Sequence, residues 1–99
     1  MSPDPRPLLV FFSSRRSGPA RRMESLLAHL ARKQRDRLRV TIVDVDDRAE
    51  LAERFGVDIV PTLVLVKDRR AVARIEGRAS APRIERMLEP HLDPELAVA

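Results

Sequence analysis

Residues 8–12 read LLVFF, an unbroken apolar run of the length of a strand. Successive side chains of a strand point to opposite faces of the sheet, so a run that is apolar at every position must be buried on both sides. The run therefore predicts a central strand in a sheet that is covered on both faces. The segments that follow must supply the covering layers.

A helix and a second strand follow. The helix shows one apolar face, at the three- and four-residue spacing of Met23, Leu26, Leu27, Leu30 and Ala31. Ser17 can cap this helix, and Pro19 suits its first turn, where no amide hydrogen bond is lost. The β-branched run at 38–45 predicts the next strand. A strand, a helix and a strand in this order predict a crossover between parallel strands.

The second half of the chain predicts a short helix and a hairpin. Asp46 or Asp47 is expected to cap the short helix, which ends at Gly56. Runs at 62–66 and 71–76, joined by a polar turn, predict the two strands of the hairpin.

A last helix begins after Gly77 and is capped by Ser80. Its apolar positions are Ile84, Met87, Leu88 and Leu92. The order β-α-β-α-β-β-α predicts an α/β fold with a four-stranded mixed sheet flanked by helices. We expect an extended leader at 1–7, one domain at 8–92 and a loose C-terminal tail at 93–99.

Composition narrows the function. The 99 residues are 43% hydrophobic, enough for one small core, and none is a cysteine. Without cysteine the chain has no disulfide, no thiolate metal site and no thiol chemistry, and we expect no metal or cofactor. No apolar run is long enough to cross a membrane, and the opening MSPDPRP has prolines where a secretion signal is apolar. We therefore expect a cytoplasmic protein without a membrane partner.

The charge is uneven, because residues 1–39 hold ten of the 19 cationic residues but only three of the 15 acidic ones. A basic half can indicate an anionic partner. The chain has no Trp or Tyr and only three Phe, so bases would find few rings to stack on, and no nucleic-acid-binding motif is present. Nucleic acid or another polyanion is therefore the least favoured partner.

Four collinear segments resemble the thioredoxin family over residues 8–92. FFSSRRSGPARRM resembles the strand, Cys-Gly-Pro-Cys turn and helix of that family, and VDVDDRAELAERFGVDIVPT resembles the next strand, short helix and Val-Pro-Thr loop. LVLVKDRRAVARIEG resembles the closing hairpin and SAPRIERML the final helix. The resemblance implies a minimal thioredoxin fold that lacks the N-terminal strand and helix of full-length thioredoxins.

The residues that carry the family's chemistry are replaced. Ser17 and Ala20 stand at the two cysteine positions, Phe11 at the position of a buried acid, and Arg16 at that of a tryptophan. In the family, one cysteine attacks a disulfide as a thiolate and the other resolves the mixed disulfide. Serine cannot substitute, because an alkoxide needs an activating base and no histidine lies nearby in sequence. The chain as written therefore has no catalytic residue for thiol–disulfide exchange.

The resemblance also implies a binding groove. It places a cis peptide bond before Pro61, beside the Ser17–Ala20 turn, where the family pairs an extended substrate segment as an added strand. Such a groove needs no sulfur. The candidate binding residues are Arg16, Ser17, Gly18, Pro19, Ala20, Val60, Pro61 and Thr62.

Four arginines, at 15, 16, 21 and 22, surround the positive end of the first helix. Two interpretations stay open: a solvated rim, or a docking site for an acidic peptide or a phosphate-bearing partner.

Two functions follow from the resemblance. The first is a redox-inactive protein- or peptide-binding or scaffolding module that uses the former active-site surface. The alternative is a thiol–disulfide oxidoreductase, monothiol or dithiol, in which the cysteine at position 17, at position 20 or at both has been replaced in this chain.

Overall fold

The computed structural model describes residues 4–93. Its elements, in chain order, are β1 (Leu8–Ser13), α1 (Gly18–Lys33), β2 (Arg39–Asp44), α2 (Ala49–Arg54), β3 (Thr62–Lys67), β4 (Arg70–Glu76), α3 (Ala81–Leu88) and a 3₁₀ turn (Glu89–His91). This is the predicted order, and within residues 4–93 the first strand is β1. Only Asp93 of the predicted tail lies in the described part of the chain, and residues 94–99 lie outside it.

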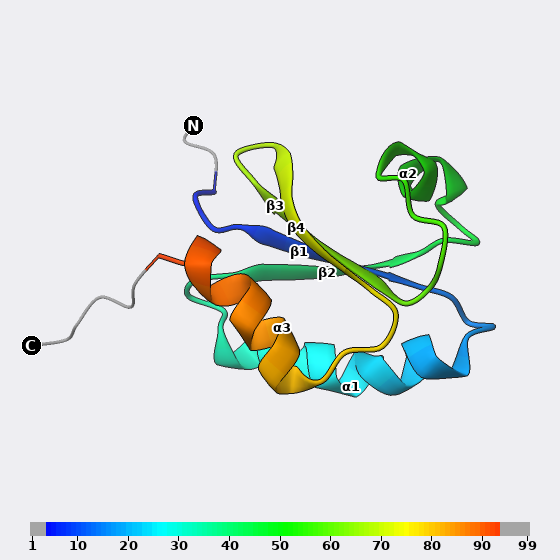
Figure 1. The fold of residues 1–99 in the computed structure, drawn as a ribbon, viewed down its shortest axis with the longest axis horizontal. Coiled ribbons are helices and arrows are strands. Elements are labelled where there is room, and N and C mark those ends of the chain that lie inside the picture. The colour runs from blue at the N-terminus through cyan, green and yellow to red at the C-terminus, as the bar shows by residue number, and fades with distance from the viewer. Residues whose placement is uncertain (1–3, 94–99) are drawn as a thin grey trace, which may run out of the picture.

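The four strands form one mixed sheet in the order β2-β1-β3-β4 (Figure 1). β1 runs parallel to β2 and antiparallel to β3, and β3 pairs antiparallel with β4. The α1 crossover thus joins two parallel strands, as the sequence predicts. β1 lies inside the sheet, which confirms the central strand expected from LLVFF.

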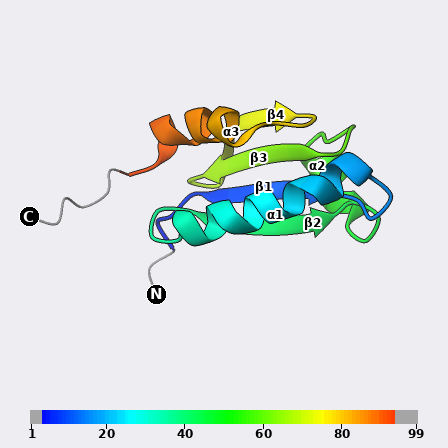
Figure 2. The ribbon, with the colours of Figure 1, turned by 90° about the horizontal axis from the view of Figure 1, so that it is seen from below.

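Helices cover both faces of this sheet. α1 and α3 lie side by side on one face, where they pack against Leu9 and Phe11, and α2 lies on the other, against Val10 and Phe12 (Figure 2). All four side chains are buried, because alternate residues of β1 face alternate layers.

Two of the three expected helix caps are present. The Ser17 hydroxyl accepts a hydrogen bond from the Ala20 amide at 3.1 Å, and the Ser80 hydroxyl accepts one from the Arg83 amide at 3.4 Å. The expected cap of the short helix is wrong. α2 begins after Arg48, which makes no side-chain cap.

The two aspartates expected at that cap instead contact the loop after β1. The Ser14 hydroxyl donates to the Asp46 carboxylate at 2.7 Å, and Arg15 lies 3.3 Å from the Asp47 carboxylate. A sequence spacing of 32 residues gives no sign of these contacts, so local capping rules assigned the aspartates to the nearer helix.

Two turns fix the hairpin and its exit. Asp68 and Arg69 both have positive φ, at 52° and 66°, which is the two-residue turn that matches strand twist. Gly77, at φ 84°, ends β4, and its amide donates to the Pro61 carbonyl at 2.8 Å. This bond ties the exit of β4 to the entrance of β3.

Among the described residues, no helix is both long and apolar enough to span a membrane.

Candidate functional site

Three loops meet at one end of the sheet. Phe12 near the end of β1 pairs with Thr62 at the start of β3, and Thr62 pairs with Glu76 at the end of β4. The β1–α1, α2–β3 and β4–α3 loops therefore lie at the same end of the strands, as Figure 1 shows. The candidate residues at 16–20 and 60–62 thus belong to loops at one end of the molecule.

The Ser17–Ala20 turn is a well-formed helix start. Ser17 has extended backbone angles and its carbonyl accepts the Arg21 amide at 3.0 Å, while Pro19 occupies the first turn. Ser17 is half-buried, whereas Ala20 is completely buried in the core under α1. Of the two positions at which the resemblance places cysteines, the first thus reaches the surface and the second lies in the core.

Removing the Ser17 hydroxyl should lower the free energy of unfolding by about 1 kcal/mol, because the Ala20 amide loses its partner. Urea denaturation of Ser17→Ala measures the loss. Ser25→Ala, on the exposed middle of the same helix, is the control and should be neutral or slightly stabilising, since alanine favours helix. Equal losses in both variants would show that Ser17 does not act as a cap.

The loop before the turn is held by the acidic loop after β2. Ser14 is buried, and its hydroxyl donates to Asp46 while it accepts the Arg16 amide at 3.1 Å. Arg15 lies 3.4 Å from the Asp44 carboxylate. Ser14 and Asp46 were missed as site residues, because a serine and an aspartate in two separate loops form no recognisable motif.

These contacts divide the four arginines of the rim. Arg15 pairs with Asp44 and Asp47, and Arg16 lies 4.0 Å from Asp46 although its side chain is 87% exposed. Arg21 and Arg22 are exposed and have no hydrogen-bonding or ionic side-chain partner within residues 4–93. The cationic charge that is left unpaired therefore lies on α1 rather than on the loop.

The second predicted loop carries a cis peptide bond between Val60 and Pro61. Pro61 and Thr62 are buried, and the Thr62 hydroxyl donates to the Ile59 carbonyl at 2.7 Å. Val60 is half-buried, and neither its amide nor its carbonyl is hydrogen-bonded to any residue that the structure describes. Val60 thus offers a donor and an acceptor to an incoming backbone.

Burial separates the eight candidate residues into two groups. Ala20, Pro61 and Thr62 are buried and can only support the site, whereas the other five reach the surface. Ile59, which the sequence analysis omitted, is 48% exposed next to Val60. No sequence signal singles out Ile59, because the same loop also holds Phe55, Val57 and Val60; only its exposure in the fold does.

Phe11, which stands where the resemblance places a buried acid, lies in an apolar environment. Phe11 is completely buried in the same cluster as Ala20. Within residues 4–93 no group of three His, Asp or Glu side chains is placed to hold a metal ion. The loops present unpaired backbone, apolar and arginine groups, and the absence of cysteine from the sequence excludes thiol chemistry.

Comparison with known proteins gives one consistent result. The sequence model described as Thioredoxin matches residues 2–90. The chain is 32% identical over 83 residues to the thioredoxin of Alicyclobacillus acidocaldarius subsp. acidocaldarius, covering 84% of this chain and 79% of that protein. A thioredoxin of Nicotiana alata has a similar structure, with a TM-score of 0.82, 30% identity and coverage of 91% of this chain and 76% of that one. The thioredoxin of Fasciola hepatica also gives a TM-score of 0.82, at 28% identity, with coverage of 89% and 83%. The chain therefore belongs to the thioredoxin family.

Proposed function

We propose that this chain is a redox-inactive thioredoxin-like module that binds an extended segment of a partner protein. The segment lies across the Ser17–Ala20 turn and the loop before β3. The proposed partner is a cytoplasmic protein.

The observation that carries this proposal is the unpaired backbone of Val60. A buried or half-buried amide and carbonyl cost free energy when they have no partner, and an added strand satisfies both at once. Ile59, 48% exposed beside them, supplies an apolar contact for one side chain of that strand. Backbone bonds give such a complex its affinity, and the side-chain contacts give it selectivity.

Ile59→Ser should weaken the binding of an extended peptide by about tenfold, which is the expected effect of removing one well-buried apolar contact. Peptides are first selected from a random library on the wild-type protein, and their dissociation constants are then measured by calorimetry. The substitution should leave the melting temperature nearly unchanged, because Ile59 contributes little to the core.

Ile42→Ser is the matched control. Ile42 is 49% exposed, on β2 and outside the three loops, so the same change there removes a similar exposed area. A library that yields no peptide, or equal losses of affinity from both substitutions, would refute binding at the loop before β3.

The alternative, an oxidoreductase that has lost its sulfurs, is supported by one observation of its own. Ser17 is half-buried at a helix N-terminus and Ala20 is completely buried one turn later. This is an arrangement in which an accessible thiol would be activated and a second thiol shielded. Restoring the two sulfurs tests it directly.

A further inference from the structure

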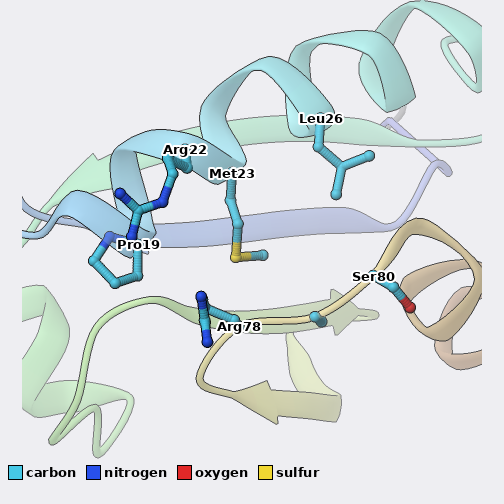
Figure 3. A pocket seen from close by; sticks show the side chains of 7 residues that line it. Pro19, Arg22, Met23, Leu26, Arg78 and Ser80 are labelled. Carbon is cyan, nitrogen blue, oxygen red and sulfur yellow. The ribbon is translucent and has the colours of Figure 1, made fainter.

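A groove runs between α1 and the loop that joins β4 to α3. Its cavity volume is about 350 Å³, at the small end of the range for ligand sites, so it accommodates one or two side chains rather than a cofactor. The lining residues are Pro19, Arg22, Met23, Leu26, Arg78, Ala79 and Ser80. Figure 3 shows Arg22 extending from α1 and Arg78 from the opposite loop, with Met23 pointing into the space between them.

The charge of the groove is one-sided. Arg22 and Arg78 are both exposed, and no acidic side chain lines the groove. Neither guanidinium group is hydrogen-bonded or ion-paired to any residue in the described part of the chain. The Arg22 side chain folds back over the start of α1, close to Gly18. A Cβ atom added to Gly18 would lie 3.4 Å from the Arg22 guanidinium. The guanidinium groups of Arg22 and Arg78 are therefore free to bind carboxylates, which match their planar geometry.

The wall of the groove on the α1 side is apolar. Pro19, Met23 and Leu26 line it, and Met23 and Leu26 belong to the helix stripe that packs on the core. Pro19 and Leu26 are half-buried and form the accessible part of this wall, which suits a contact with an aliphatic residue, whereas Met23 is only 6% exposed and lies behind them. The groove thus combines an apolar wall with two unpaired cations.

The groove is continuous with the site of the proposed function. Pro19 belongs both to the Ser17–Ala20 turn and to the groove. Arg78 follows Gly77, whose amide is hydrogen-bonded to the Pro61 carbonyl. A segment that lies beside Val60 can therefore continue past Pro19 into the groove.

We propose that this groove selects partner segments in which an aliphatic side chain is flanked by glutamate or aspartate, with Arg22 and Arg78 binding the carboxylates. The inference rests on the proposed function for its site, and it adds the chemistry of the partner. It also places the anion contact on Arg22 and Arg78 rather than on Arg15 and Arg16, whose charges the acidic loop already pairs.

The test uses two blocked, fluorescent peptides. In one, glutamates alternate with leucines, and in its twin every glutamate is glutamine. Fluorescence anisotropy with the wild-type protein should give binding of the glutamate peptide that is about tenfold tighter than that of the twin and weakens with added salt.

Two double variants with the same loss of charge make the test specific. Arg22→Gln with Arg78→Gln should remove the preference for the glutamate peptide. Arg32→Gln with Arg86→Gln should keep it, because both arginines are exposed on α1 and α3 and neither lines the groove. Equal effects of the two double variants would mean that only net charge matters, and would overturn the inference.

The remaining outcomes separate the groove from the proposed function. If Ile59→Ser weakens the binding of both peptides about tenfold while Arg22→Gln with Arg78→Gln changes neither, the strand site stands and the groove inference fails. If inorganic phosphate competes as well as the glutamate peptide does, the groove is a site for free anions and the inference again fails. If neither peptide binds, and the random library also yields none, both proposals fail.

Discussion

Replacing Ser17 and Ala20 together by cysteine is expected to create disulfide-reductase activity that the wild-type chain and Ser17→Cys alone lack. The assay is the reduction of insulin by dithiothreitol, followed by turbidity. Mass spectrometry after mild oxidation should show an intramolecular disulfide in the double variant. This is the largest expected change in activity, since the wild-type chain has no thiol and adds nothing to the uncatalysed rate.

The geometry of the turn is the reason. Ser17 is the N-cap of α1, with extended backbone angles, and its side-chain oxygen lies 3.1 Å from the Ala20 nitrogen in the first turn. A disulfide needs Cβ atoms about 3.5–4.5 Å apart, and a capping side chain folded over the first turn suits this better than two residues three apart within a helix, whose Cβ atoms are about 5–6 Å apart. The helix N-terminus lowers the pKa of a thiol at position 17, so that more of it is the nucleophilic thiolate. Ala20 is fully buried, so a thiol at position 20 is shielded from solvent and can attack only the mixed disulfide formed at position 17.

The control is a second Ser and Ala pair on the same helix. Ser25 and Ala28 have the same spacing and are both exposed, in the middle of α1 and away from its N-terminus. Ser25→Cys with Ala28→Cys should stay close to the uncatalysed rate, although it carries the same number of thiols. A folded Ser17→Cys, Ala20→Cys protein without activity would show that the loops no longer support exchange, and would end the oxidoreductase alternative.

Most of the fold could be predicted from local patterns. The run LLVFF gave the central strand because its alternate residues face α1 and α2 in turn, and the spacing of Met23, Leu27 and Leu30 gave the buried face of α1. Ser17 and Ser80 cap as expected because capping is decided within three residues. Asp46 was misassigned because its true partner, Ser14, is 32 residues away.

The site was less predictable for the same reason. The resemblance to the thioredoxin family indicated the turn at Ser17–Ala20 and the loop at Val60, but burial in the fold decides which of those residues reach the surface. Ile59 and Arg78 belong to no sequence motif. They become candidate binding residues only because the fold exposes Ile59 and places Arg78 across the groove from Arg22. Likewise, the sequence does not show which of the four arginines have acidic partners. In the fold, Arg15 pairs with Asp44 and Asp47.

Phe11→Asp is expected to have the largest effect on stability. Phe11 is completely buried between the sheet and α1, and removal of a core Phe alone costs about 3–5 kcal/mol. An unpaired carboxylate in that apolar cluster adds a desolvation cost. Since small domains are stable by only about 5–15 kcal/mol, the variant should be largely unfolded at neutral pH. Circular dichroism and urea denaturation measure this, and Phe11→Leu should lose only about 1.5 kcal/mol.

The loss should depend on pH in one direction. Burial raises the pKa of the new carboxyl in the folded state above its value in the unfolded chain. Below the unfolded pKa the group is neutral in both states, so the variant is least destabilised in acid. As the pH rises from the unfolded pKa to the higher folded pKa, the unfolded chain gains the negative charge first. The free energy of unfolding therefore falls steadily over this range. A variant as stable as Phe11→Leu at neutral pH would show that this site is not apolar.

This result bears on the missing chemistry. The family resemblance places a proton-relaying acid at the position of Phe11, directly beneath the turn. In this chain Phe11 packs in one apolar cluster with Ala20 and Leu63. A cysteine at position 17 lies at the surface of the turn and one at position 20 must fit a single sulfur into this cluster, whereas a carboxylate at position 11 would be buried in it without a partner. We therefore expect the double cysteine variant to exchange disulfides but to resolve them slowly, because no buried base assists its second thiol.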